Sequence, residues 1–207
     1  MSEEGTPISP PARPGEGDAS GTTQAGPSDL ELLQQIARKD EAAFAELYQR
    51  FKGRVLNLAY RYLGNREEGE MATQDTFLRV WQNADRFRGN AQVWTWIYRI
   101  TANLCMNMKS RKPLPTEELD DTVPASDAHQ PADAHVRREQ EELVRKALDC
   151  LPADQRMAIV LSRFEQLSYE EIGQTMNKSP RAIATLLFRA RENLRHRLLP
   201  FQRRGLI

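Results

Sequence analysis

Arginines gather at the C-terminal end of this chain. From Ser179 to Ile207 the sequence holds seven arginines and a single acidic residue, Glu192. Guanidinium groups bind phosphate oxygens and the edges of bases through paired hydrogen bonds, so such a run is typical of a surface that binds nucleic acid. Solubility alone does not explain this local excess of positive charge. The alternative from composition is a plain helical hairpin that packs on a partner protein.

The residues before and within this run have the spacing of a helix-turn-helix. Ser168 and Glu171 form a capping box, which starts a short helix. Asn177-Lys178 makes a tight turn, and Ser179-Pro180 then caps and opens a longer helix. The N-terminal residues of the second helix in this motif contact base edges. The positions predicted to bind DNA are Ser179, Arg181, Ala182, Thr185 and, one turn further on, Arg189.

Residues for catalysis or metal binding are not grouped in this sequence. The histidines (His129, His135 and His196) have no metal-ligand spacing to the cysteines, and no glycine-rich phosphate loop or nucleophile motif occurs. Cys105 and Cys150 lie in apolar helical patterns and are expected to be reduced core thiols, with a structural disulfide as the alternative. We therefore expect no enzyme activity, cofactor, metal or small-molecule substrate.

The overall charge of zero conceals an alternation along the chain. Residues 29–112 and 141–207 each carry a net charge of +4, whereas residues 1–28 and 113–140 carry −3 and −5. Two basic blocks separated by an acidic spacer indicate two modules that face a polyanion, and ordinary solvated helix surface is the alternative. No apolar run reaches the roughly 20 residues of a membrane span, and no secretory signal is visible. We expect a cytoplasmic protein.

The elements that must position these residues are helices. Apolar residues recur at helical spacing from Phe44 to Tyr62, and Gly64-Asn65 ends that helix. Further helices are predicted at 66–84, from Val93 to Met108, from about Val136, and after Pro152. Pro, Gly and polar residues dominate 1–28 and 113–135, which predicts a disordered tail and a flexible acidic linker. The predicted fold is all-α, with two small helical domains joined by that linker, the C-terminal one a helix-turn-helix.

A family resemblance covers both blocks. The stretch LPADQRMAIVLSRFEQLSYEEIGQTMNKSPRAIATLLFRARENLRHRL closely resembles the bacterial sigma-factor domain that reads the minus-thirty-five promoter element. The first block independently resembles the sigma domain that binds polymerase and opens the minus-ten element. The resemblance lies in three stretches: AFAELYQRFKGRVLNLAYRYLG, QDTFLRVW and FRGNAQVWTWIYRITANL. A linker replaces the domain that other sigma factors have between these two, which resembles the small extracytoplasmic-function group. The resemblance implies core RNA polymerase and promoter DNA as partners; members of that group are often held by an anti-sigma factor, but nothing here identifies one.

The resemblance also implies roles for residues of the first domain, residues 29–112, whereas 136–207 would form the promoter-reading domain. Arg99, Lys109, Arg111 and Lys112 would follow phosphates. Trp94 is expected mainly in the core, whereas Trp96 fits the core or the DNA site equally well. Glu70, Gln74, Asp75 and Arg79 share part of one helix face, which would dock on the polymerase. The positions that would hold an unpaired base are Asn83, Phe87, Arg88, Gly89, Asn90, Ile100 and Asn103.

Three positions depart from the family pattern. Relatives usually carry an acid where Met71 stands, and long polar side chains where Ala184 and Leu186 stand. Polymerase contact and base preference could both be altered by these changes. Two other functions therefore remain open at this point: a free-standing helix-turn-helix regulator, and a sigma-like adaptor that binds polymerase without reading promoters.

Overall fold

The computed structural model describes residues 26–110 and 132–203 of the chain, but not the side chains of residues 132–139 and 141. Within these ranges it contains eight α-helices and one short 3₁₀ helix, without a strand. The prediction of an all-α fold is confirmed. The predicted tail, apart from its last three residues, and the predicted linker up to residue 131 lie outside the described residues.

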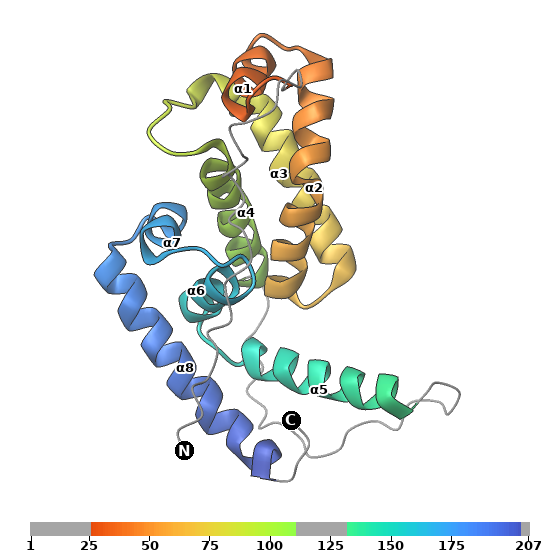
Figure 1. Ribbon diagram of the computed structural model, residues 1–207, viewed down its shortest axis with the longest axis vertical. Coiled ribbons are helices and arrows are strands. Elements are labelled where there is room, and N and C mark those ends of the chain that lie inside the picture. Colours follow the sequence, from red (N-terminus) through yellow and green to blue (C-terminus); the bar gives the residue numbers. More distant parts are fainter. Residues whose placement is uncertain (1–25, 111–131, 204–207) are drawn as a thin grey trace, which may run out of the picture.

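Four helices form the first bundle: α1 (Asp29–Ala37), α2 (Glu41–Leu63), α3 (Arg66–Asn83) and α4 (Val93–Ser110), with the 3₁₀ turn η1 (Ala84–Arg86) between the last two (Figure 1). The Asp40 side chain caps α2 by accepting from the amides of Ala42 and Ala43. Gly64 ends α2 in the left-handed region at φ 77°, where a side chain would be strained. The three helices predicted in this block are confirmed.

Helix α1 was not among the predicted elements. Its Ser28 and Glu31 form a capping box, and Leu32, Leu33 and Ile36 are buried against the bundle. Both features are present in the sequence, because a serine followed three residues later by glutamate and then by spaced apolar residues is a helix-start signal. The core of the first domain therefore uses four helices rather than three.

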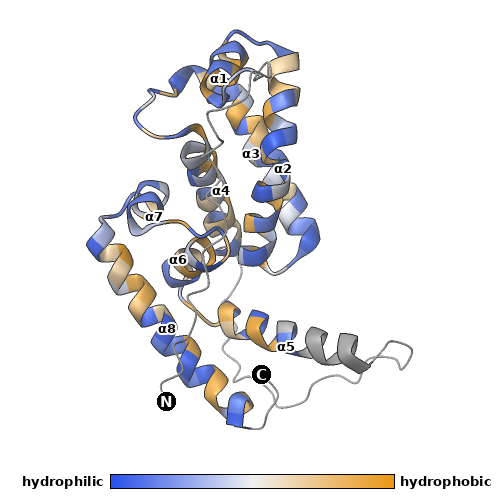
Figure 2. Ribbon diagram, viewed as in Figure 1, coloured by the Kyte–Doolittle hydropathy of each residue, from blue (hydrophilic) through white to orange (hydrophobic). Residues whose placement is uncertain are grey.

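The second bundle consists of α5 (Ala132–Asp149), α6 (Ala153–Arg163), α7 (Tyr169–Met176) and α8 (Pro180–Arg203). Helix α5 begins at Ala132, four residues before the domain boundary expected at 136, so the end of the predicted linker is helical. Pro152 is the N-cap of α6 rather than its first helical residue, although it starts the helix as predicted. The apolar faces of these helices turn toward one another (Figure 2).

The two bundles are in contact. Helix α4 packs against α7 and α6, and α2 packs against α6, so one buried cluster runs from the first bundle into the second (Figure 1). Cys105 is buried and Cys150 is half-buried, and both are free thiols, which confirms that they form no disulfide. None of the helices in the described ranges is long and apolar enough to cross a membrane.

Candidate nucleic-acid interface

The helix-turn-helix is held by local hydrogen bonds that the sequence predicted. The Ser168 amide donates to the Glu171 carboxylate at 2.7 Å, and the Glu171 amide donates to Ser168 Oγ at 3.2 Å. Asn177 ends α7 in the left-handed region at φ 54°. Ser179 Oγ then accepts from the Ala182 amide at 3.2 Å, which caps α8. The predicted box, turn and cap are all confirmed.

The turn brings the backbones of α7 and of the connection to α8 very close together. A Cβ atom added to Gly173 would lie 2.6 Å from the carbonyl oxygen of Lys178. The amide of Lys178 donates back to the carbonyl of Gly173 at 2.9 Å. Only a residue without a side chain allows this approach, so Gly173 sets the angle at which α8 leaves the turn.

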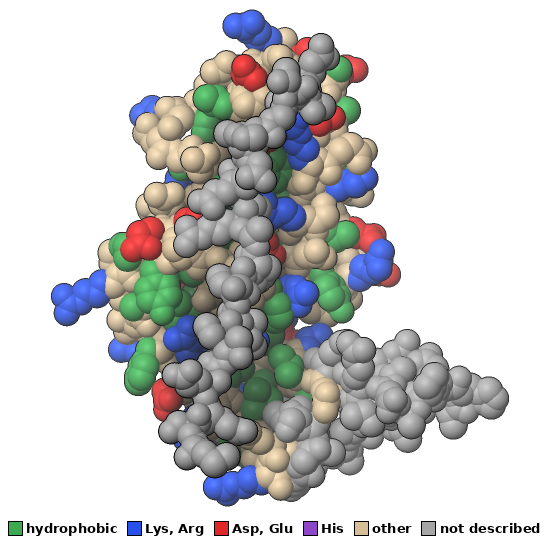
Figure 3. All heavy atoms as spheres, in the orientation of Figure 1, with side chains coloured by type: hydrophobic (Ala, Val, Ile, Leu, Met, Phe, Trp, Pro, Cys, Tyr) green, Lys and Arg blue, Asp and Glu red, His purple; other side chains and the backbone are tan. Residues whose placement is uncertain are grey.

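The first turns of α8 present the predicted DNA-binding side chains to solvent. Ile183 and Leu187 are fully buried and fix the opposite face of the helix against the bundle. Thr185 Oγ1 donates to the Arg181 carbonyl at 3.1 Å. Lys and Arg side chains lie along α8 and at both of its ends on the face shown in Figure 3. Four predicted residues are exposed, namely Ser179, Arg181, Thr185 and Arg189, whereas Ala182 is half-buried.

Sequence reasoning missed one residue on this surface. Phe188 is 66% exposed, more than any other large hydrophobic side chain in the described residues. It follows Arg181 and Thr185 at helical spacings of seven and three, so the three side chains share one face. The LLFRAR pattern shows that Phe188 lies in the helix but gives it no role. The sequence signal for its exposure is that Phe188 lies outside the apolar stripe made by Ile183, Leu187 and Ala190.

In the first domain, a loop and the start of α4 bring together several residues implied by the resemblance. Phe87 is half-buried and its ring meets that of Trp96 edge-on, with centroids 5.5 Å apart. Gly89 adopts φ 73°, and a Cβ added to it would have no other atom within 4 Å, so there is open space beside the loop. Arg88, Gly89 and Asn90 are exposed, and Ile100 is half-buried further along α4.

Two further residues expected to hold the unpaired base, Asn83 and Asn103, lie outside the loop at Phe87. Asn103 is exposed on α4. Asn83 is half-buried, and its amide group donates to the Arg79 carbonyl at 2.9 Å, so this side chain is engaged within α3. Trp94 and Trp96 are both half-buried and pack against the core, Trp94 edge-on to Tyr98 with centroids 5.6 Å apart. The side of α4 that faces the loop is therefore aromatic and partly accessible.

The exposed face of α3 carries the residues expected to dock on polymerase. Glu70, Gln74, Asp75 and Arg79 are all exposed, and Glu70 forms an ion pair with Arg66 at 3.0 Å. Two large apolar side chains lie among them, Met71 at 58% exposure and Leu78 at 53%. They are seven residues apart and share that face. Leu78 was not singled out from the sequence, whereas Met71 stood out only as a departure from the family pattern.

Two predicted phosphate-binding residues point instead into the contact between the bundles. Arg99 donates from Nε and Nη2 to the Gln174 carbonyl, at 3.1 and 2.8 Å. Lys109 pairs with Asp149 at 2.8 Å. Both partners belong to the second bundle. Arg111 and Lys112 lie outside the described residues.

The described residues hold no group of three or more His, Cys, Asp or Glu side chains that could bind a metal ion. Buried titratable groups are few. Burial, and then the charge of Glu165, raise the pKa of Tyr98. Burial, partly offset by the charge of Arg156, raises the pKa of Tyr62 to about 12. Both phenols therefore stay protonated at neutral pH, and Tyr98 is a hydrogen-bond donor. The candidate nucleic-acid interface therefore offers positive charge, hydrogen-bond donors and accessible aromatic rings.

Two family models match the chain. Residues 47–112 match sigma-70 region 2, and residues 141–194 match sigma-70 region 4. The RNA polymerase sigma-H factor of Pseudomonas aeruginosa is 30% identical over 190 residues, covering 84% of this chain and 96% of that protein. The ECF RNA polymerase sigma factor SigW of Bacillus subtilis is 33% identical over 177 residues, covering 80% and 94%.

Solved structures share the fold. CnrH in complex with the cytosolic domain of CnrY has a TM-score of 0.61 at 24% identity, covering 80% of this chain and 94% of CnrH. The sigma factor RpoE of Bartonella quintana, in complex with the anti-sigma factor NepR, has a TM-score of 0.55 at 24% identity, covering 75% and 96%.

A helix-turn-helix with an arginine-rich recognition helix, joined to a second helical domain of the sigma type, defines a promoter-specificity subunit of bacterial RNA polymerase. Within that class, the chain belongs to the extracytoplasmic-function sigma factors of the sigma-70 family. The protein therefore directs RNA polymerase to particular promoters. A free-standing regulator would account for the second match alone and leave the first domain without a role.

Proposed function

We propose that the two bundles divide promoter recognition between them. The helix-turn-helix binds the minus-thirty-five element as duplex, the loop at Phe87 and helix α4 hold a base of the opened minus-ten strand, and the outer face of α3 docks on core polymerase. The observation that carries the proposal is the first part of α8, where Arg181, Thr185 and Arg189 are exposed while Ile183, Leu187 and Ala190 on the other side are buried.

Recognition of the upstream element rests on hydrogen bonds from the first turns of α8. Arginine binds guanine O6 and N7 through two parallel hydrogen bonds, and each good pair discriminates against the wrong base by about 1–3 kcal/mol. Arg181 and Arg189 are free to make such pairs, because the described structure gives neither side chain an ion pair. Ser179 and the capped start of α8 would contact a phosphate, which positions the helix in the groove.

Strand opening rests on trapping an unpaired base. Phe87 and Trp96 offer an aromatic surface, and stacking on such a surface contributes about 1–3 kcal/mol per base. Gly89, with its positive φ and open surroundings, lets the backbone of the loop approach the base closely. No bond is made or broken, so the protein acts by binding alone and is not an enzyme.

The polymerase contact uses the α3 face. Met71 and Leu78 supply apolar surface, and Glu70, Gln74 and Asp75 supply acceptors for basic groups of the partner. Interfaces commonly combine such an apolar centre with a polar rim. An anti-sigma partner fits the two similar structures, each solved with a bound protein, and the work of the complex takes place in the cytoplasm, where polymerase is found.

The upstream assignment is tested by transcription from a cognate promoter, selected from a random library with purified core polymerase. Arg181→Ala should lower initiation and weaken the footprint over the upstream element, by about tenfold for the loss of a bidentate pair. Arg163→Ala, an exposed arginine on α6, is the matched control and should leave both unchanged. An unchanged footprint with Arg181→Ala refutes the assignment; core binding without any initiation by the unaltered protein would favour the adaptor.

The opening step is tested separately. Phe87→Ala should reduce open-complex formation more than closed-complex binding, because the base is trapped only after the strands part. A heteroduplex bubble over the minus-ten region should restore activity to this variant. Absence of rescue by the bubble would give Phe87 a different role.

A further inference from the structure

Lys39, in the connection between α1 and α2, has a backbone conformation that lysine rarely adopts. Its φ is 68°, in the left-handed region, where a residue with a Cβ atom is strained and glycine is not. The amides of Lys39 and Asp40 donate to the carbonyls of Ile36 and Gln35, at 2.9 and 3.2 Å. This is the pattern of a helix end closed by a left-handed residue, usually glycine. The backbone alone would favour glycine at position 39, so the lysine side chain needs an explanation.

The side chain of Lys39 reaches the end of α3, 42 positions further along the chain. Its Nζ donates to the Trp81 carbonyl oxygen at 3.1 Å and lies 5.2 Å from the centroid of the Trp81 ring. Trp81 belongs to the last turn of α3, where carbonyl oxygens lack an amide partner within the helix and the helix dipole is negative. An ammonium group suits both the carbonyl and the ring, so Lys39 caps α3 from outside.

The end of α3 leads directly into the loop proposed to hold the unpaired base. Helix α3 ends two residues after Trp81, η1 follows, and Phe87 comes next. The short helix η1 packs against α1, and its Ala84 is buried (Figure 1). On its other side Phe87 meets the ring of Trp96 in α4. The start of the loop is therefore held by α1 and Lys39, and Phe87 is held by α4.

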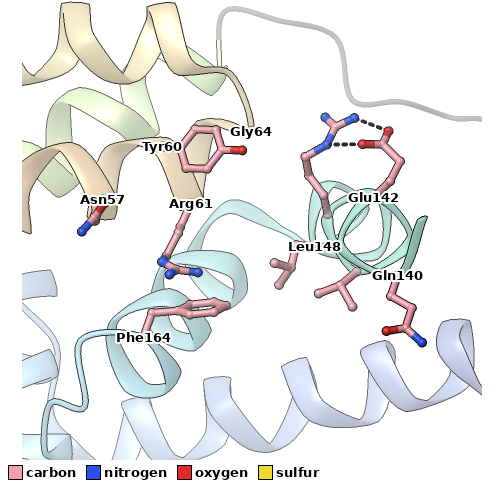
Figure 4. Close-up of a pocket in the computed structure, with 10 residues that line it drawn as sticks. Asn57, Tyr60, Arg61, Gly64, Gln140, Glu142, Leu148 and Phe164 are labelled. Carbon is pink, nitrogen blue, oxygen red and sulfur yellow. Dashed lines mark hydrogen bonds and ion pairs between the residues drawn. The ribbon is translucent and has the colours of Figure 1, made fainter. Parts of the chain in front are cut away.

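Helix α2 starts next to Lys39, and its other end takes part in a different contact. There Tyr60 lines a groove of about 760 Å³ with Leu148 and Phe164 of the second bundle (Figure 4). At 1.5 Å per residue, Tyr60 lies about 28 Å along α2 from Glu41. The support of the loop therefore comes from the α1 end of the first bundle, and the groove has no part in it.

We propose that Lys39 is a positioning residue for strand opening: its side chain fixes the end of α3 and η1, and so places Phe87 before the base is unpaired. The inference rests on the proposed function, which assigns the loop at Phe87 to the minus-ten strand. Backbone strain that the fold does not require is typical of residues with a functional side chain. A loop that is already in place loses less conformational freedom when the base binds.

The Lys39→Gly substitution separates positioning from stability. Glycine adopts a φ of 68° without strain, so the melting temperature of the variant should not fall. Opening of a cognate promoter by the holoenzyme should fall about threefold, because the bond that holds the end of α3 is lost. Permanganate reactivity of unpaired thymines measures opening. Closed-complex binding, measured by gel shift at low temperature, should not change.

Gln166→Gly is the matched control. Gln166, between α6 and α7, is likewise left-handed at φ 56°, and its side chain is exposed and makes no hydrogen bond in the described structure. Its glycine variant should open the promoter normally. Equal opening by the unaltered protein and Lys39→Gly, or equal losses in both glycine variants, would overturn the positioning role. A melting temperature that falls together with opening would show that the lysine only stabilises the fold.

Lys39→Arg tests whether the cation itself matters. Arginine keeps a positive charge and hydrogen-bond donors at this position, so the variant should retain most of the opening activity. A loss as large as that of Lys39→Gly would exclude capping of α3 as the reason for the lysine.

Phe87→Ala distinguishes failure of this inference from failure of the proposed function. Since Lys39 acts through Phe87, the Lys39→Gly/Phe87→Ala double variant should open no less than Phe87→Ala alone. Additive losses would place the action of Lys39 elsewhere and overturn the positioning role, while the base-holding site would stand. Unchanged opening by Phe87→Ala would instead overturn the proposed function of the loop.

Discussion

Phe188 is an exposed aromatic side chain on α8, the helix that we propose binds the upstream promoter element. A large aromatic residue that is mostly exposed in a soluble helix is informative, because burying it would be favourable. The Phe188 ring lies on the same face of α8 as Arg181. We therefore expect it to enter the same DNA groove as this arginine. Thymine presents a methyl group in the major groove, which apolar side chains recognise.

At this scale we expect Phe188→Ala to weaken binding to the upstream element by about 1 kcal/mol, or fivefold in affinity, through loss of apolar contact. The melting temperature should not fall, because the side chain makes little contact within the fold. Fluorescence anisotropy on promoter DNA with the holoenzyme measures the affinity. Val144→Ala, a half-exposed residue of the same domain, is the control, and equal effects of the two variants would contradict the role.

The two thiols give a second prediction at the scale of the residue. Burial raises the pKa of the Cys105 thiol to about 12, whereas Cys150 is only half-buried. In native protein at pH 8, a thiol reagent should modify Cys150 alone, and in denaturant both cysteines. Rapid modification of two thiols in the native state would be inconsistent with the buried position of Cys105.

The raised pKa of Cys105 also makes the free energy of unfolding depend on pH. The unfolded chain releases the Cys105 proton near pH 8.5, whereas the folded protein keeps it until about 12. Since the unfolded state binds fewer protons within this window, the free energy of unfolding should decline from about pH 8.5 upwards, and less so in a Cys105→Ala variant. Denaturant titrations at a series of pH values measure this slope.

At the scale of the element, the turn between α7 and α8 depends on one glycine. A Cβ at position 173 would meet a backbone carbonyl at 2.6 Å, and a backbone atom cannot move aside as a flexible side chain could. Gly173→Ala should therefore destabilise the helix-turn-helix domain by about 2 kcal/mol or more. Thermal unfolding followed by circular dichroism measures the loss.

Gly53 provides the matched control for that substitution. It lies within α2 with nothing within 4 Å of a Cβ, so Gly53→Ala should be neutral or stabilise by about 0.5–1 kcal/mol through helix propensity. If both alanine variants unfold at the same temperature, close backbone approach does not govern the turn.

Helix α3 illustrates how an element can be amphipathic and still expose apolar surface. Leu78 and Met71 are exposed and lie among polar residues, on the face of α3 that we propose docks on polymerase. We expect Leu78→Glu to weaken core polymerase binding by at least about tenfold, because a charge would be buried in the contact. Leu30→Glu, on α1 and 46% exposed, should have no effect; similar losses for both would remove α3 from the interface.

At the scale of the whole molecule, Asp149 joins the two bundles through one carboxylate. It accepts from Lys109 of the first bundle and lies 3.2 Å from the guanidinium of Arg156, which is only 1% exposed. Arg156 also donates to the carbonyls of Leu148, Asp149 and Leu151. A buried cation of this kind is stable because its partners remain in place.

We therefore expect that removing the Asp149 carboxylate lowers the free energy of unfolding more than removing the Lys109 ammonium group does. Asp149→Ala should lower the free energy of unfolding by about 3 kcal/mol, because it leaves Arg156 buried without its counter-ion. Lys109→Met keeps the Asp149–Arg156 pair and should cost about 1 kcal/mol or less. Denaturant titration measures both, and a Lys109→Met loss as large as that of Asp149→Ala would contradict the network.

The sequence by itself determined the helices, most of their ends, and the helix-turn-helix. Ser168, Glu171, Gly64 and Ser179 act on amides and carbonyls within four residues, so their effects are encoded locally. Even α1, which was missed, carries a capping box and a buried stripe that are readable in the sequence. The family patterns in both blocks likewise lie within continuous stretches of chain.

Only the tertiary structure decided which functional side chains are free and which are engaged. Arg99 meets Gln174 across 75 positions of the chain and Lys109 meets Asp149 across 40, and no local pattern encodes such pairs. How far the side chains of Phe188 and Leu78 are exposed was decided only when the neighbouring helices were in place. The physical reason is that capping depends on nearby backbone atoms, whereas exposure and pairing between domains depend on how distant segments pack.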